Sequence, residues 1–337
     1  MKFFCIVCFF AFNPILMLGQ CNYYYYVNKA EVSICDKNLE KAVEYYDSAF
    51  INLDTIPYYK DAYNAFVVSV DLQNEQKVLE FWKNLCTLGI DSAFMYESST
   101  FNSLSEKVFW GNLVLDIKKY KSPKLEYLSE LQKIMDMDQS VRMWCKLKGP
   151  DIYKLCTDTI RNVDSINYQN LLNFRRKNGA FLENVCVKGI PGETPIYYLI
   201  LEHNAQWKRL WAADFLIQDI KNTKFHPLFY SKLMDYYINT HTPESSDLYF
   251  GTNYHAIVKG RLFIFPPSES IEKRINNRRK SICLESMEDY HKKLKFQFFN
   301  PHKYYFIYGA LFGTLDVDEE VSVILFDKWQ NAEIKKD

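Results

Sequence analysis

The residues whose types and spacing best suit chemistry begin with an acid, an amide and a guanidinium in one short stretch. Asp138 and Gln139 precede Arg142, so a helix here places Asp138 and Arg142 on one face. A carboxylate in that position orients the guanidinium, which then binds an anionic ligand through paired hydrogen bonds. The alternative is a surface ion pair, which contributes roughly a few tenths of a kcal/mol.

A second basic stretch lies near the end of the chain. Asn276, Arg278 and Arg279 fall on a helix predicted over 268–280. Two guanidiniums and an amide are suited to a carboxylate or a phosphate. The same residues also suit a solvated basic helix face, and both interpretations stay open.

A short loop precedes a predicted hairpin and holds Tyr249, Gly251 and Thr252. Glycine allows a tight turn and a close backbone approach, so this loop can present amides and a hydroxyl to a ligand. The alternative is a plain connection into the first strand.

His203 is the weak catalytic candidate, as a general acid or base, although a lone histidine near Trp207 also suits ordinary packing. No second histidine stands at metal-ligand spacing from it, and the sequence has no GxSxG, P-loop, GxGxxG or HExxH motif. We therefore predict no metal and no cofactor.

Taken in order, these motifs resemble a bacterial domain of unknown function that often follows tetratricopeptide-like helices in exported proteins of the Bacteroidetes. The resemblance covers about 125–295 and implies no activity. It rests on Asp138-Gln139-x-x-Arg142, Asp164-Ser165-x-Asn167, His203, Tyr249-x-Gly251-Thr252 and Asn276-x-Arg278-Arg279. Tyr236 stands where the pattern has Arg, and Asn253 stands where it has Gln. These departures imply that any site of the family is altered or inactive in this copy.

The elements that must position these residues begin with two repeated helices. A small, an aromatic and a small or apolar residue recur at the same offsets, which is typical of the second helix of a tetratricopeptide-type repeat. The two sets are Ala42, Tyr46 and Ala49, and Val78, Trp82 and Leu85. Two such units are one short of a stable solenoid, so we expect these helices to pack on the segment that follows.

The remaining periodicity predicts a mainly α protein: tetratricopeptide-like helical hairpins followed by an α-rich domain with a small β-hairpin. Further helices are predicted over 106–120, 124–147, 167–177, 196–222 with a break near 204, 227–239, 268–280 and 287–298. Strands over 254–258 and 261–265 flank Lys259-Gly260. Residues 317–329 suit a strand or an amphipathic helix. The predicted segments are 1–19, 22–121, 122–300 and a C-terminal extension over 301–337.

The first nineteen residues have the character of a secretory signal peptide, with a lysine, an apolar run and a small-residue exit. Cleavage after Gly19 releases an exported protein, periplasmic or secreted. The alternative is lipidation of Cys21 and an outer-membrane lipoprotein, although Gln20 is a poor fit to that motif. Membrane association is expected only in the lipidated case.

Nine cysteines occur in the sequence, two of them inside the signal segment. The odd number that remains and its wide spacing predict no disulfide framework, and most of these cysteines are expected to be buried small apolar residues. Cys21 with Cys35 is the pairing considered.

Charge and composition limit the function. Lys and Arg number 41 and Asp and Glu number 41, so the balance does not favour nucleic acid as a partner. The leading hypothesis is an exported protein that binds or scaffolds a protein or peptide partner in the cell envelope. The alternative is a hydrolase or transferase acting on an anionic or peptide-like substrate through an Arg/His/Thr site, so the sequence leaves open whether the protein is an enzyme.

Overall fold

The computed structural model is mainly α-helical, as predicted, with one small sheet. It describes residues 21–51, 53, 56–90, 99–104, 111, 113, 124–149, 156–180, 194–205, 213–241, 249–301, 303–307, 314–315 and 319–334. The predicted signal segment 1–19 and most of the helix predicted over 106–120 lie outside these residues. No helix in the described part combines the length and apolar character needed to cross a bilayer.

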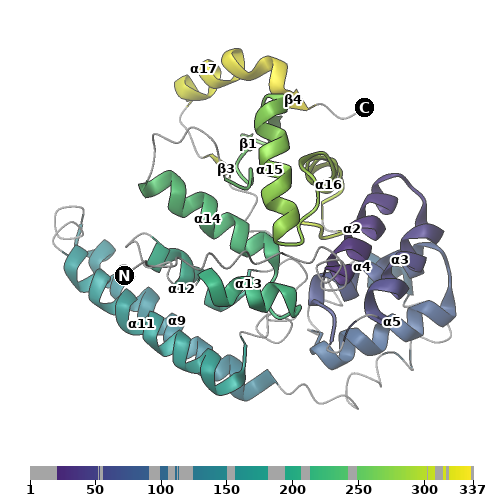
Figure 1. Ribbon diagram of the computed structural model, residues 1–337, viewed down its shortest axis with the longest axis horizontal. Coiled ribbons are helices and arrows are strands. Elements are labelled where there is room, and N and C mark those ends of the chain that lie inside the picture. The colour runs from purple at the N-terminus through teal and green to yellow at the C-terminus, as the bar shows by residue number, and fades with distance from the viewer. Residues whose placement is uncertain are drawn as a thin grey trace, which may run out of the picture.

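Four helices at the N-terminal side form two helical hairpins (Figure 1, right). They are α2 (Asn22–Cys35), α3 (Leu39–Ile51), α4 (Tyr59–Asp71) and α5 (Glu75–Leu88), with α2 packed on α3 and α4 on α5. The repeated residues predicted to pack are all buried, namely Ala42, Tyr46, Ala49, Val78, Trp82 and Leu85. A short helix, α7 (Ser99–Leu104), packs against α4.

The turns of the two hairpins repeat as well. Lys37 and Gln73 each end a helix in the left-handed region, at φ 59° and 55°. The next residues, Asn38 and Asn74, start the following helices, and each side-chain oxygen accepts a hydrogen bond at 3.2 Å from the backbone N–H three residues on. The two units thus share turn geometry in addition to interior packing.

A second group of helices lies at the lower left of Figure 1. It consists of α9 (Lys124–Leu147), α11 (Thr157–Asn178) and α12 (Ile196–Ala205), which pack on one another. A disulfide between Cys145 and Cys156 joins the end of α9 to the start of α11. This connection fixes the pairing of the two longest helices among the described residues.

Four further helices come later in the chain. They are α13 (Ala213–Lys221), α14 (Pro227–His241), α15 (Glu269–Ser281) and α16 (Met287–Phe299). Helix α12 extends to Ala205 and α13 begins at Ala213, and the segment 206–212 next to the break predicted near 204 lies outside the described residues.

The sheet contains more than the predicted hairpin. Strands β1 (His255–Val258) and β2 (Arg261–Ile264) pair antiparallel around Lys259-Gly260, whose φ values are 46° and 74°. Two short strands extend it to the order β3-β1-β2-β4, with β3 (Thr314–Leu315) parallel to β1 and β4 (Glu333–Ile334) antiparallel to β2.

The segment left open between strand and helix forms α17 (Glu319–Trp329), which is followed by a short 3-10 turn, η3 (Gln330–Ala332). Phe326 and Trp329 of this segment pack their rings on Phe263 of β2, with centroids 5.8 and 5.6 Å away. Helix α17 therefore lies against the sheet (Figure 1, top).

The N-terminal hairpins pack on the last part of the chain, far in sequence from the segment that directly follows them. Helix α2 packs on α16. Asn64 of α4 exchanges two hydrogen bonds with the backbone of Tyr305, at 2.8 and 2.9 Å, and the Tyr304 hydroxyl donates to Asp71. The start of the predicted C-terminal extension is thus part of the support for the first two hairpins.

Candidate functional site

Three helices bring acidic, basic and imidazole groups together in the Asp138 cluster, which consists of Asp138, Arg142, Asp164 and His203. Arg142 lies between the two carboxylates: Nε is 3.4 Å from Asp138 Oδ2, and Nη2 donates to Asp164 Oδ1. His203 Nδ1 lies 3.0 Å from Asp138 Oδ1. Gln139 Nε2 donates to Asp138 Oδ2 at 2.6 Å. Candidates from α9 and α12 therefore meet, with Asp164 of α11 completing the group.

Burial distinguishes this cluster from the surface ion pair considered for Asp138 and Arg142. Asp138 and Asp164 are fully buried, whereas the Arg142 and His203 side chains each keep a small exposed edge. Asp138 shares the buried side of α9 with Leu131, which explains its position. The surface interpretation is wrong because the helix period directs the Asp138 carboxylate inward, where Arg142 and His203 contact it.

The groups around Asp138 keep its carboxylate ionised. Burial alone would raise the pKa of Asp138, but the hydrogen bond and charge of His203, with the charge of Arg142, outweigh burial and lower that pKa. An ionised carboxylate only accepts hydrogen bonds, so His203 Nδ1 donates to Asp138 and Nε2 is the ring nitrogen left for other partners. An imidazole oriented in this way by a buried carboxylate is suited to general acid–base chemistry.

The same groups could also ligate a cation. One ligand atom each from Asp138, Asp164 and His203 lies within 4.8 Å of the others. Two carboxylate oxygens and one imidazole nitrogen suit zinc or manganese. However, Arg142 hydrogen-bonds both carboxylates and already places a positive charge between them, so the residues fit a guanidinium better than a divalent cation.

The second set of candidates forms the Asp235 cluster, which consists of Asp235, Thr252 and Arg279. The Asp235 carboxylate accepts from Phe250 N at 2.6 Å and from Thr252 N and Oγ1, both at 2.7 Å. Arg279 is fully buried. Its guanidinium donates to Phe250 O at 2.9 Å and to Glu285 O at 2.6 Å. Burial raises the pKa of Asp235 despite these hydrogen bonds. The cluster holds the loop over 249–252 against α14 and α15.

The other motif residues support the same loop. Gly251 has φ 74°, and a Cβ there would lie 2.8 Å from Met287 Sδ, so both conformation and space favour glycine. Asn276 Oδ1 accepts from Met287 N at 2.8 Å. Arg278 stacks on the Tyr249 ring, with its guanidinium carbon 4.2 Å from the ring centroid, and donates to Tyr249 O.

The candidate residues therefore fall into two groups. Asp138, Gln139, Arg142 and His203 meet through α9, α11 and α12, whereas the candidates from 249–279 bind one another between α14, α15 and α16. The interpretation of Arg279 as part of a solvated basic face is wrong, because its guanidinium satisfies backbone carbonyls inside the protein.

A buried ion network lies outside the residues predicted from the sequence and consists of Glu31, Lys60, Asp61, Glu285 and Lys293. Lys60 pairs with Glu31 and, at 2.7 Å, with Asp61. Lys293 pairs with Glu31 at 2.8 Å and with Glu285 at 3.2 Å. A signal existed, since Glu31 stands beside Ala30 on the apolar face of its helix, where a charge requires a partner.

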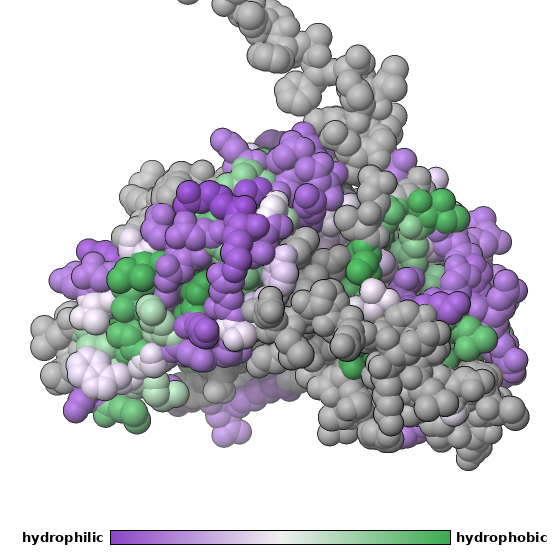
Figure 2. Space-filling model, turned by 90° about the horizontal axis from the view of Figure 1, so that it is seen from below, coloured by the Kyte–Doolittle hydropathy of each residue, from purple (hydrophilic) through white to green (hydrophobic). Residues whose placement is uncertain are grey.

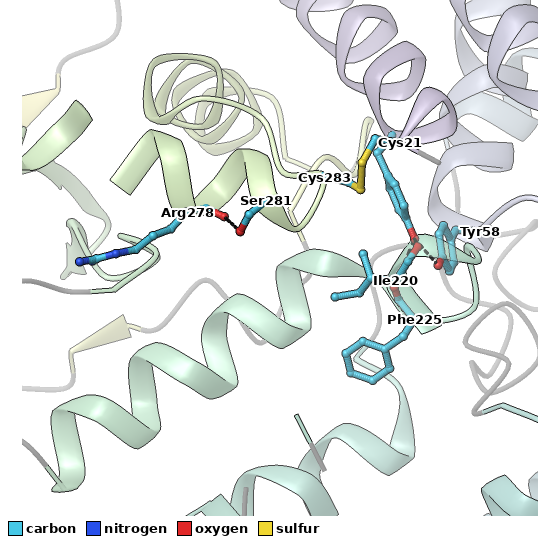
Figure 3. The surroundings of a disulfide bond; sticks show 8 residues. Cys21, Tyr58, Ile220, Phe225, Arg278, Ser281 and Cys283 are labelled. Atoms are coloured by element: carbon cyan, nitrogen blue, oxygen red, sulfur yellow. Dashed lines mark hydrogen bonds between the residues drawn. A yellow bond between two sulfur atoms is a disulfide. The ribbon is translucent and has the colours of Figure 1, made fainter. Parts of the chain in front are cut away.

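A disulfide crosses the molecule close to this network (Figure 3). Cys21 pairs with Cys283, 262 residues later, with Cα atoms 5.3 Å apart. The Cys21–Cys35 pairing considered from the sequence does not form, and Cys35 is a free cysteine. With Cys145–Cys156, four cysteines are bonded, which corrects the expectation of mostly unpaired cysteines. Distance in the fold, which spacing along the chain does not reveal, decides these pairs.

Comparison with known proteins adds no relative. No family model matches the chain, and no curated protein and no solved structure is significantly similar to it.

Proposed function

We propose that this protein is exported and binds a protein or peptide partner in the cell envelope through the outer face of α9. The observation that carries the proposal is a group of large apolar side chains exposed there. Met143 is 58% exposed, Trp144 54% and Leu147 78%, and Met137 lies 45% exposed further along the helix. In Figure 2 hydrophobic residues are exposed among hydrophilic ones at the end formed by α9 and α11, on the left.

The chemistry of this face suits an interface. Tryptophan and methionine are enriched where proteins bind one another, and buried tryptophans often carry much of the binding energy. Methionine adapts to irregular partner surfaces. The Cys145–Cys156 disulfide holds the end of α9 that presents Trp144, so little order has to be gained on binding.

The export half of the proposal rests on the apolar segment before Gly19 and on two disulfides, which persist in oxidising compartments. A lipid on Cys21 would require the sulfur that bonds Cys283, so the released form is favoured. An intact mass of the exported protein tests this. A chain beginning at Gln20 is expected, and a diacylglyceryl-modified Cys21 would overturn release.

The partner is tested by photo-crosslinking in the envelope fraction with a reactive residue placed at Met143. We expect one discrete adduct. A second probe position, Met137, should give the same adduct in the otherwise unchanged protein and none in the variant M143S/W144S/L147S. The matched control is V323S/I324S on α17, which removes exposed apolar side chains elsewhere and should leave the adduct unchanged. No adduct, or equal loss in both variants, contradicts the proposal.

A second candidate function is acid–base catalysis by a hydrolase or transferase, favoured by the contact of His203 Nδ1 with Asp138 at 3.0 Å. Arg142 would bind an anionic substrate and His203 Nε2 would move the proton. Chromogenic ester, phosphate and peptide substrates test it. Turnover should fall about a hundredfold or more in H203Q and remain in H291Q. Equal turnover in H203Q and the unmodified protein would exclude His203.

A further inference from the structure

An open cleft lies beside the Cys21–Cys283 disulfide, on different elements from the proposed α9 interface. Its volume is about 620 Å³, within the range of small-molecule sites. The walls are the first turns of α2, the end of α13, and the end of α15 with the turn after it. Its described lining residues include Asn22, Tyr24, Tyr25, Lys221, Lys280 and Glu285.

One wall is aromatic and firmly placed. The Tyr24 hydroxyl is hydrogen-bonded to the Tyr58 hydroxyl at 2.9 Å and to the carbonyl oxygens of Ile220 and Phe225 (Figure 3). The next ring, Tyr25, is more than half exposed. Tyr24 is almost completely buried and supports this wall, so the Tyr25 ring is the one that offers a ligand apolar contact area.

The cleft lining also carries positive charge. Lys221 ends α13 and Lys280 lies in the last turn of α15, and neither forms an ion pair with a described residue. The one acid among the described lining residues, Glu285, is already paired with Lys293 and Arg279. The local balance therefore favours an anion, and the amide of Asn277 provides a further hydrogen-bond donor.

A disulfide bond links two segments of the cleft lining. The Cys21–Cys283 bond joins the start of α2 to the turn between α15 and α16, and both cysteines belong to the lining. Figure 3 shows Arg278 directed away from this bond, so that its guanidinium belongs to the Tyr249 loop and not to the cleft. Lys221 and Lys280 are thus the cations of the described lining.

We propose that this cleft binds a small organic anion, with its carboxylate or phosphate at Lys221 and Lys280 and its apolar body against Tyr25. Lysine ammonium groups attract both anions as point charges, so either headgroup satisfies the same two residues. The inference is independent of the α9 interface, because no residue is shared.

The test is a fluorescence titration of the exported chain with anilinonaphthalene sulfonate, an aromatic anion, and with phenylnaphthylamine, its uncharged counterpart. We expect saturable binding of one sulfonate probe per chain. K221E/K280E should weaken it about tenfold or more while changing the uncharged probe little, since two exposed charges are reversed. The matched control K133E/K328E, with exposed lysines on α9 and α17, should change neither probe.

Displacement distinguishes the natural headgroup. Benzoate and phenyl phosphate are added separately to the bound probe, and the stronger competitor identifies a carboxylate or a phosphate site. M143S/W144S/L147S should keep full probe binding, which separates this cleft from the α9 face. Probe binding that is absent, or that survives K221E/K280E unchanged, overturns the proposal.

Discussion

Glu31 of α2 and Lys293 of α16 form a buried ion pair, with 2.8 Å between Lys293 Nζ and Glu31 Oε2. Both side chains are almost completely removed from solvent. Burial alone would lower the pKa of Lys293, but the charges of Glu285 and Glu31 outweigh burial and raise it. The pair therefore stays charged and ties the first helix of the described chain to the last part of the α-rich region.

Replacing Lys293 with methionine should lower the free energy of unfolding by about 3–5 kcal/mol, because Glu31 and Glu285 lose a shared buried cation. Urea unfolding measures the change. K41M, which breaks an exposed pair with Glu44, is the control and should have no measurable effect. If K293M is as stable as K41M, the network does not support the fold.

The two disulfides should contribute unequally. Cys21–Cys283 closes a separation of 262 residues and Cys145–Cys156 one of 11. Chain entropy predicts losses of about 5 kcal/mol for C21S/C283S and about 3 kcal/mol for C145S/C156S. Unfolding of the two double variants in urea compares them, and the opposite order would contradict the entropic account.

Gly251 should tolerate alanine less well than Gly179. Both have positive φ, 74° and 78°, so both substitutions strain the backbone by about 1 kcal/mol. A Cβ at Gly251 also meets the buried Met287, whereas nothing lies within 4 Å at Gly179, so G251A should cost about 1–2 kcal/mol more. Equal melting temperatures for G251A and G179A would show that Met287 yields freely.

Stability should fall as the pH is lowered, in part because of His291. Burial, with the charges of His255 and Arg279, lowers the pKa of His291 to about 4. Between the unfolded value of about 6.5 and this one, the unfolded chain binds a proton that the folded chain does not, so the free energy of unfolding decreases by up to about 1.4 kcal/mol per pH unit. Urea unfolding across this range should show a shallower dependence in H291Q, and an unchanged slope would place the effect elsewhere.

Local periodicity predicts most of the helices, because each buries one apolar face whatever its neighbours. The 42–49 and 78–85 patterns are examples. The Lys259-Gly260 turn is also a local signal, because it needs only the two residues that form it. Strands β3 and β4 are only two residues long, too short for an alternating pattern. The pairing of Cys21 and the partner of Glu31 depend on contacts across most of the chain, which no local window contains.

The sequence predicts several residues of the candidate site, but it does not predict which of them meet in the fold. Asp138, Arg142 and His203 meet, as the chemistry of each suggests. Thr252 and Arg279 have equally functional side chains, yet Thr252 Oγ1 donates to the buried Asp235 carboxylate and Arg279 donates to the main-chain carbonyl of Phe250. Residue type alone cannot separate these roles, because a guanidinium binds a substrate phosphate and a main-chain carbonyl by the same hydrogen bonds.

The Cys21–Cys283 bond also turns the chain into a macrocycle that contains everything between those two residues. A protease that cuts one loop inside the ring leaves a single covalent molecule, which still migrates as one band until it is reduced. In an environment rich in extracellular proteases, a nicked copy would therefore keep its pieces together and its helices paired. A second cut within the ring, or a reductant, would then release a fragment.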